Sequence, residues 1–232
     1  MQTVSLPGSL QGYLATPAGA GPWPGVLVLH EAFGLTDDIR SITDRFAANG
    51  YAALAPDLLS WGPSFRCLVS TFNDLIRRRG EAHERIDAAG RWLAGHPSCS
   101  GRVGVAGFCM GGGFALLGAP RQVFAASAVN YGIVPHHAAD VLAGACPIVA
   151  SYGGKDRTMR GHAARLEAAL EQNGVEHDVK EYPAVGHGFM NHHTGWATAF
   201  DRVGFRYSEP EAEDAWGRIT RFFTTHLSEP GT

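Results

Sequence analysis

The chain has 232 residues, of which 45% are hydrophobic and 18% are charged, a composition that excludes disordered and coiled-coil proteins. Its 19 Lys and Arg against 22 Asp and Glu give a net charge of −3, with no basic stripe beyond Arg77–Arg79, so no nucleic-acid partner is expected. Apolar runs are far shorter than the ~20 residues of a membrane-spanning helix, and the N-terminal sequence lacks a secretory-signal pattern. We therefore expect one cytoplasmic domain over residues 1–232, with no membrane partner and its four cysteines reduced.

Strand and helix patterns alternate along the first part of the chain. Val26–Leu29 is a continuous apolar run, which is typical of a strand buried on both faces. A helix from about Thr36 to Gly50 follows, because Thr36 can cap its start and Gly50 can end it. Tyr51–Ala55 is the next strand. Residues 58–73 are the least regular stretch and are expected to form mostly a surface loop.

The alternation continues to the C-terminus. A helix at Glu81–Ala94 precedes a strand at Val103–Ala106 and a helix at Gly112–Leu117. Further strands and helices are predicted at Phe124–Val129, Pro147–Tyr152, Gly161–Glu171 and Val175–Tyr182, and in an amphipathic segment after Ser208. This order predicts an α/β fold, a three-layer sandwich whose mostly parallel sheet carries helices on both faces.

A glycine-flanked cysteine carries the sharpest chemical pattern. Gly107-Phe108-Cys109-Met110-Gly111 directly follows a buried strand and precedes a helix, the layout of the nucleophile elbow G-x-S-x-G with Cys in the Ser position. The glycines leave room for a strained turn, and the start of the helix favours a thiolate. A buried structural cysteine in a glycine-rich turn is the alternative interpretation.

An acid and a histidine follow the cysteine in the order that such an elbow needs. Asp156 comes just after the strand at 147–152, and His187 comes after the strand at 175–182. Because the carboxyl ends of parallel strands meet at one edge of the sheet, these side chains are expected to lie near Cys109. Taken singly, Asp156 could be a turn residue and His187 an ordinary loop histidine. The remaining histidines lack metal-ligand spacing, so neither a metal nor another cofactor is expected.

Four segments in this order resemble the dienelactone hydrolase family. They are His30–Leu35, the elbow at 107–112, Tyr152–Asp156 and Gly186–Met190, and the resemblance extends over about residues 12–227. It implies an α/β-hydrolase fold with a Cys-His-Asp triad, in which Cys109 is the nucleophile, His187 the base and Asp156 the residue that orients it. It also implies an oxyanion hole formed by the backbone N–H groups of Ala32 and Met110.

The resemblance further implies cysteine-dependent hydrolysis of a lactone or small carboxylic ester through a thioester, by a monomer or homodimer. Family members active on dienelactone carry an arginine four residues after the catalytic histidine, where this chain has Asn191. The natural substrate therefore stays open. The candidate substrate-binding side chains are Phe33, Trp61, Phe65, Arg66, Phe108, Asn191 and Trp196. Each of them could equally belong to the core or to the surface.

Glu31 corresponds, by the same resemblance, to a glutamate that contacts the nucleophile thiol. Two like charges ~4 Å apart cost about 4 kcal/mol at an effective dielectric near 20, which exceeds the ~0.3–1 kcal/mol that a helix terminus contributes. We therefore predict a neutral Cys109 at rest, with Glu31 as its acceptor. The alternative is that Glu31 only forms a structural ion pair.

Two other classes of protein compete with this interpretation. Glutamine amidotransferases also use a cysteine elbow, but their acid closely follows the histidine, whereas Asp156 precedes His187 here. A redox-sensing or ligand-binding protein could keep the same scaffold without catalysis.

Overall fold

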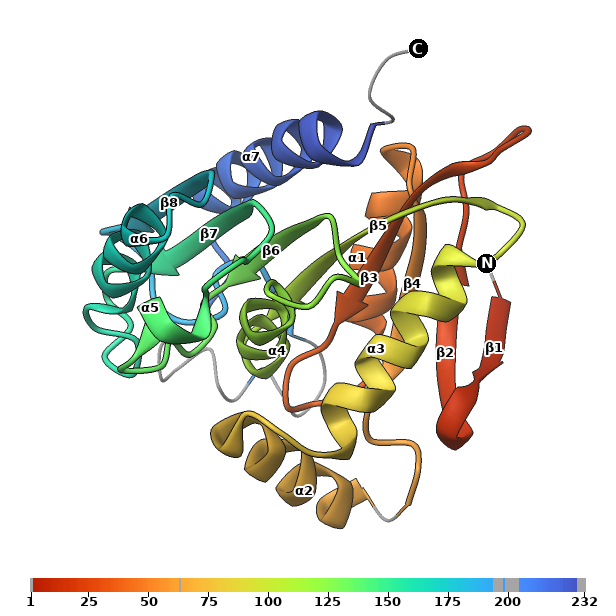
Figure 1. Ribbon diagram of the computed structural model, residues 1–232, viewed down its shortest axis with the longest axis horizontal. Coiled ribbons are helices and arrows are strands. Elements are labelled where there is room, and N and C mark those ends of the chain that lie inside the picture. The colour runs from red at the N-terminus through yellow and green to blue at the C-terminus, as the bar shows by residue number, and fades with distance from the viewer. Residues whose placement is uncertain (1, 63, 194–197, 199–204, 229–232) are drawn as a thin grey trace.

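The protein is built on one eight-stranded sheet (Figure 1). The structure, a computed structural model, describes residues 2–62, 64–193, 198 and 205–228. The strands are β1 (Gln2–Leu6), β2 (Leu10–Ala15), β3 (Trp23–Leu29), β4 (Ala52–Asp57), β5 (Cys99–Phe108), β6 (Ala126–Asn130), β7 (Ile148–Gly153) and β8 (His177–Tyr182). Their spatial order is β1-β2-β4-β3-β5-β6-β7-β8, and all neighbours from β4 to β8 run parallel. β2 runs antiparallel to both β1 and β4.

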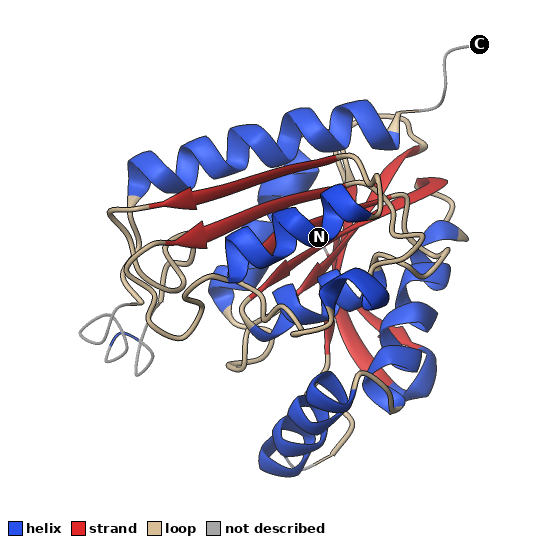
Figure 2. Cartoon of the chain, turned by 60° about the vertical axis from the view of Figure 1, so that its left-hand side comes forward, coloured by secondary structure: helices blue, strands red, loops and turns tan. Residues whose placement is uncertain are grey.

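Helices cover both faces of this sheet (Figures 1 and 2). They are α1 (Asp37–Ala48), α2 (Ser64–Arg77), α3 (Glu81–Ala94), α4 (Met110–Gly118), α5 (Ala138–Val141), α6 (His162–Gln172) and α7 (Glu209–Leu227), and a 3₁₀ turn, η1 (Pro7–Ser9), joins β1 to β2. Within the described ranges, none of these helices combines the length and apolar character that crossing a bilayer requires.

The continuous apolar run in β3 is explained by the two cores. Leu27 and Leu29 pack into the core beneath α3, α4 and α6, whereas Val26 and Val28 pack into the core beneath α1 and α7. Successive side chains of a strand point to opposite faces, so a strand covered on both sides needs an apolar residue at each position. The predicted α/β sandwich is therefore confirmed.

The predicted elements correspond well to the observed ones, with two corrections. The helix predicted at Glu81–Ala94 has those bounds, but the loop expected at 58–73 is wrong because α2 occupies most of it. Helix α2 buries Cys67, Thr71 and Leu75 against the body while its opposite face exposes Phe65, Val69, Phe72 and Ile76. Because α2 has apolar residues on both faces, its sequence lacks the alternation of apolar and polar residues by which an amphipathic helix is predicted. The hairpin β1–β2 was not predicted, since β1 is a short, largely exposed edge strand.

A buried arginine ties α7 to the strands at one side of the sheet. Arg218 is 5% exposed, donates to Asp178 Oδ1 at 2.8 Å and Oδ2 at 2.9 Å, and also donates to Ser151 Oγ at 3.0 Å. It further donates to the backbone oxygens of Ala150 and Asp178, at 3.1 and 2.6 Å. A buried guanidinium with this many acceptors fixes both the position and the orientation of the helix.

Replacing Arg218 tests this attachment. We expect Arg218→Met to lower the free energy of unfolding by about 2–4 kcal/mol, because it leaves buried acceptors unpaired while the Asp178 carboxylate is partly solvated. The measurement is urea unfolding followed by circular dichroism. Arg221→Met, at an exposed position on the same helix, is the matched control and should change stability by less than about 0.5 kcal/mol. Equal stability of the two variants would contradict the assignment.

Candidate active site

Cys109 lies at the turn between β5 and α4, directly before the first residue of the helix. Its backbone angles are φ 54° and ψ −113°, which a non-glycine residue rarely adopts. The turn is held because Cys109 N donates to Asn130 O at 3.0 Å and Gly113 N donates to Cys109 O at 3.1 Å. The side chain is partly exposed, so the predicted elbow presents a sulfur that a substrate can reach.

The glycines around Cys109 are required by close backbone contacts. A Cβ on Gly107 would lie 2.0 Å from Gly111 O, and a Cβ on Gly111 would lie 2.2 Å from Leu29 O. Neither backbone oxygen can move without breaking the sheet or the helix. The chain therefore passes from β5 into α4 with no room for a side chain at position 107 or at position 111.

Asp156 and His187 meet as the sequence predicts. His187 Nδ1 lies 2.5 Å from Asp156 Oδ2, and both residues are buried. Asp156 Oδ1 accepts from the Thr158 backbone N–H at 2.8 Å and from the Thr158 hydroxyl at 2.6 Å. Burial alone would raise the pKa of Asp156, but the hydrogen bonds from His187 and Thr158 lower it below its usual value. The acid therefore stays ionised and orients the imidazole.

The other ring nitrogen of His187 faces the cysteine. Nε2 is buried and makes no hydrogen bond of good geometry to any described residue. Cys109 nevertheless lies close enough to affect the ring: burial alone would lower the pKa of His187, but Asp156 and Cys109 together raise it to about 10. Both partners favour the protonated form of the ring, and the charge of Cys109 does so when the sulfur is a thiolate.

Glu31, at the end of β3, is paired with a histidine rather than with Cys109. Its Oε2 lies 3.2 Å from His193 Nε2, while His193 Nδ1 lies 3.2 Å from Phe205 O. An acceptor at each ring nitrogen suits a protonated histidine. Glu31 Oε1 is buried and has no hydrogen-bond partner among the described residues. It lies beside the residue that follows His187, since a Cβ on Gly188 would be 3.8 Å away from it.

A second network joins Asn191 to α1. The Tyr131 hydroxyl donates to Asn191 Oδ1, and Asn191 Nδ2 donates to Asp38 Oδ2 at 2.6 Å. Burial raises the pKa of Tyr131 well above its usual value, and the nearby Glu31, Asp38 and Cys109 add to that effect. Tyr131 also contacts the His187 ring edge-on, with centroids 5.1 Å apart. Asn191 is thus a fully buried connector within the site.

The site lies where the order of strands reverses direction. From β3 the chain first forms β4 on one side and later β5 on the other, and Glu31 and Cys109 follow the adjacent ends of β3 and β5. Clefts for ligands in α/β sheets form at such points, outside the carboxyl ends of the strands. His30 fixes this loop: its Nε2 accepts from Leu58 N at 2.9 Å, which leaves Nδ1 to donate to Glu31 O.

The candidate substrate-binding residues have different surroundings. Phe33 is partly buried and its ring contacts His193 edge-on at 5.6 Å, which places it beside the site. Phe108 is fully buried between Tyr131 and Trp216, so it belongs to the core. Phe65 and Arg66 are exposed on α2, and Trp61 stacks under the Arg85 guanidinium. Trp196 lies outside the described residues. Of this set, Phe33 and Asn191 are the ones that contact the network around Cys109.

Three residues of the site were not anticipated from the sequence. Tyr131 could have been found because it lies two residues after a predicted strand and directly after the observed β6, at the same edge as Asp156 and His187. Asp38 lies in the first turn of α1, and His193 is one of two adjacent histidines in a loop. No local pattern marks their contacts with Asn191 and Glu31.

A parallel sheet with an elbow after β5, an acid after β7 and a histidine after β8 defines an α/β hydrolase. The model of the dienelactone hydrolase family matches residues 10–227. The chain therefore belongs to the dienelactone hydrolase family and is a hydrolase.

Individual relatives agree with this assignment. A protein of Azospirillum brasilense, whose name provisionally identifies it as a carboxymethylenebutenolidase, is 30% identical over 98% of this chain and 100% of its own length. The crystal structure of a dienelactone hydrolase-like promiscuous phosphotriesterase from metagenomic libraries has a TM-score of 0.80 and 25% identity, covering 98% of each chain. The dienelactone hydrolase of Anabaena variabilis has the same fold, with a TM-score of 0.67 and 24% identity over 98% of this chain and 97% of its own.

The pairing of His187 with Asp156 is testable by titration. In Asp156→Asn the pKa of His187 should fall from about 10 by roughly 1–3 pH units, because the charge of its partner is lost while burial remains. The folded-state pKa lies above the ordinary 6.5, so the stability that it contributes is present below pH 6.5 and is lost as the pH rises to about 10. NMR titration of the ring and thermal unfolding between those pH values measure both effects. Asp140→Asn, an exposed carboxylate on α5, is the control. An unchanged midpoint in Asp156→Asn would refute the pairing.

Proposed function

We propose that this protein hydrolyses a lactone or a small carboxylic ester through a thioester on Cys109. The observation that carries the proposal is the order of Cys109, His187 and Asp156 in space, with the 2.5 Å contact between the last two. The strained elbow and the partly exposed sulfur support the role of Cys109 as nucleophile. The name of the Azospirillum relative, a carboxymethylenebutenolidase, supports a lactone as the substrate.

In the acylation step, the Cys109 sulfur forms a bond to the carbonyl carbon and the carbonyl oxygen becomes negatively charged. The backbone N–H groups of Met110 and Ala32 stabilise this oxyanion; in an unrelated serine hydrolase one such donor contributes about 2.7–4 kcal/mol. Met110 is the first residue of α4, so its N–H has no partner within the helix. The leaving alkoxide takes the proton of His187, and a thioester remains.

In the deacylation step, the neutral His187 takes a proton from water, and the hydroxide attacks the thioester carbon. The carbon–sulfur bond breaks, the carboxylic acid leaves, and His187 is protonated again. Asp156 holds the imidazole in one orientation through both steps.

Glu31 completes the proton balance of this proposal. In this proposal His187 supplies its proton to the leaving alkoxide, so the proton that leaves the thiol during acylation needs another acceptor. Glu31 Oε1, which is buried and unpaired among the described residues, is the acceptor that we propose. Glu31 returns the proton to Cys109 after deacylation.

The surroundings of the site favour an uncharged substrate. Asn191 supplies no cation four residues after His187, and its amide is held by Tyr131 and Asp38. The Asp38 carboxylate contacts Asn191, the position where family members active on dienelactone carry an arginine. We therefore propose that neutral esters and lactones are preferred over substrates that carry a carboxylate, since like charges repel in a partly desolvated site.

Trapping the acyl-enzyme tests the proposed function. With p-nitrophenyl acetate, we expect steady turnover and an acetyl group on Cys109, detected by mass spectrometry of rapidly quenched protein. Cys109→Ala should lower kcat/KM by at least about 10³-fold, because the nucleophile is lost. Cys146→Ala is the matched control, because burial raises the pKa of that thiol to about 12 and makes it unreactive.

Two outcomes would reject the proposal. Turnover that persists in Cys109→Ala would assign the chemistry to another residue. Ready formation of a sulfenic acid on Cys109 without turnover would support a redox sensor on the same scaffold. A substrate panel of lactones and aryl esters, each with and without a carboxylate, then tests the preference for neutral substrates.

The role of Glu31 is tested separately from catalysis. Glu31→Gln removes a negative charge near the thiol, so iodoacetamide should label Cys109 at lower pH than in the native protein. His193→Gln leaves Glu31 without its cationic partner and should shift the labelling profile the opposite way. Glu84→Gln, which changes a carboxylate on α3, is the control. If Glu31→Gln leaves the pH profile of labelling unchanged, Glu31 takes no part in the mechanism.

A further inference from the structure

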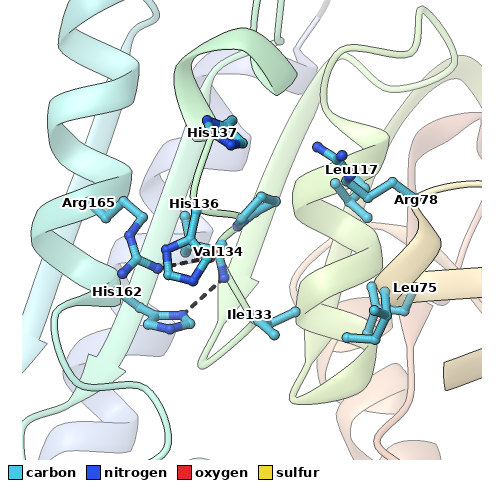
Figure 3. Close-up of a pocket in the computed structure, with 11 residues that line it drawn as sticks. Leu75, Arg78, Leu117, Ile133, Val134, His136, His137, His162 and Arg165 are labelled. Atoms are coloured by element: carbon cyan, nitrogen blue, oxygen red, sulfur yellow. Dashed lines mark hydrogen bonds between the residues drawn. The ribbon is translucent and has the colours of Figure 1, made fainter. Parts of the chain in front are cut away.

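A cavity of about 340 Å³ opens behind the helix that follows the elbow (Figure 3). Its walls come from the end of α2, the end of α4, the loop between β6 and α5, and the start of α6. Its apolar lining consists of Leu75, Ile76, Leu117, Ile133, Val134 and Pro135. Cys109, Asp156 and His187 do not line it. We call this cavity the α4 pocket.

The wall of the α4 pocket is held in shape by hydrogen bonds. Val134 N donates to His162 Nδ1 at 3.0 Å, and Arg165 Nη1 donates to Val134 O at 3.1 Å. The backbone N–H and C=O groups of Val134 thus both form hydrogen bonds within the wall of the pocket. Leu75 and Ile133 pack around α4, where a Cβ on Gly113 would lie 2.9 and 3.1 Å from them. The pocket is therefore formed before any ligand arrives, as small-molecule sites usually are.

The polar part of the lining is entirely basic. Its side chains are Arg78, His136, His137, His162 and Arg165, and none of the described residues that line the pocket is acidic. Neither arginine has a carboxylate partner in the described part of the chain, since Arg165 donates to a neutral carbonyl. Figure 3 shows Arg78 and Arg165 on opposite sides of the apolar side chains. Two uncompensated guanidinium groups beside an apolar cavity favour an anion with an apolar body.

From this combination we infer that the α4 pocket binds an amphipathic organic anion, a medium-chain or aromatic carboxylate, at a second site distinct from the residues around Cys109. The apolar body fills the cavity between α2, α4 and α6, and the carboxylate lies at its rim, where it pairs with one of the two arginines. The size of the cavity is at the lower end of the range found for small-molecule sites, which suits a ligand of this kind. The bound anion packs against α4, the helix that begins at Met110 next to the nucleophile.

Calorimetry with octanoate tests this site. The protein is first alkylated at Cys109 with iodoacetamide, so that binding as a reaction product is blocked. We expect octanoate to bind at least about tenfold more tightly than octanamide, which has the same body without the charge. Inorganic phosphate, which has charge without an apolar body, should bind at least about tenfold more weakly than octanoate.

A pair of variants on α2 locates the bound ligand. Ile76 is 61% exposed at the rim of the pocket, and Val69 is 44% exposed two turns earlier and does not line it. Ile76→Glu adds a carboxylate at the rim and should weaken octanoate binding at least about tenfold, because like charges repel. Val69→Glu introduces the same charge on the same helix and should leave binding unchanged. Both positions are solvated, so both variants are expected to fold.

Each other outcome overturns the inference. Equal binding of octanoate and octanamide would show that the arginines do not recognise an anion. Octanoate binding that alkylation of Cys109 abolishes would place the anion in the catalytic site. Sedimentation that reveals a dimer, dissociated by Ile76→Glu but indifferent to octanoate, would assign the pocket to a second copy of the chain. Because this experiment uses alkylated protein, its result is independent of whether Cys109 forms a thioester.

Discussion

The tight passage of the chain from β5 into α4 is the constraint on which the rest of the site depends. Backbone atoms of Gly107 and Gly111 approach each other and β3 so closely that no Cβ fits on either residue. This contact forces Cys109 into a backbone conformation with a positive φ and places its sulfur beyond the end of the sheet. The same contact starts α4 immediately after the cysteine, so the first N–H groups of the helix, which have no partner within it, lie next to Cys109. The sheet edge then supplies the other functional groups, because β3, β7 and β8 end at the same edge.

Charge is distributed around the sulfur in two buried pairs. Asp156 faces His187 and Glu31 faces His193, so each carboxylate has an imidazole beside it. The two pairs differ in which side chain keeps a polar atom without a hydrogen-bond partner among the described residues. In the first pair the imidazole has an unpaired nitrogen, and in the second pair the carboxylate has an unpaired oxygen, as judged from the described residues. His187 Nε2 and Glu31 Oε1 are thus the two buried polar atoms of these pairs without a hydrogen-bond partner among the described residues.

The network of Tyr131, Asn191 and Asp38 joins the loops that follow β6 and β8 to the start of α1. It places a neutral amide and a carboxylate where dienelactone-hydrolysing relatives carry a cation. None of these three described residues carries a positive charge. The α4 pocket, on the far side of α4, has the opposite character, with two arginines and no acidic lining residue among those described. The pocket meets α4 near its end, at Leu117, whereas Cys109 directly precedes the start of the same helix.

The sequence by itself predicted most of the strands and helices in their order, the turn at Cys109, and the meeting of Asp156 with His187. These features follow from local rules: a strand buried on both faces needs a continuous apolar run, and a turn without space needs glycine. Only the tertiary structure decided that Glu31 pairs with His193, that Asn191 is bound by Tyr131, and that residues 64–77 form a helix with apolar side chains on both faces. The members of these pairs are 162 and 60 residues apart along the chain, and their contact depends on how separate loops pack over the sheet edge. A periodic pattern records which face of an element is buried, but it carries no information about which distant side chain lies opposite.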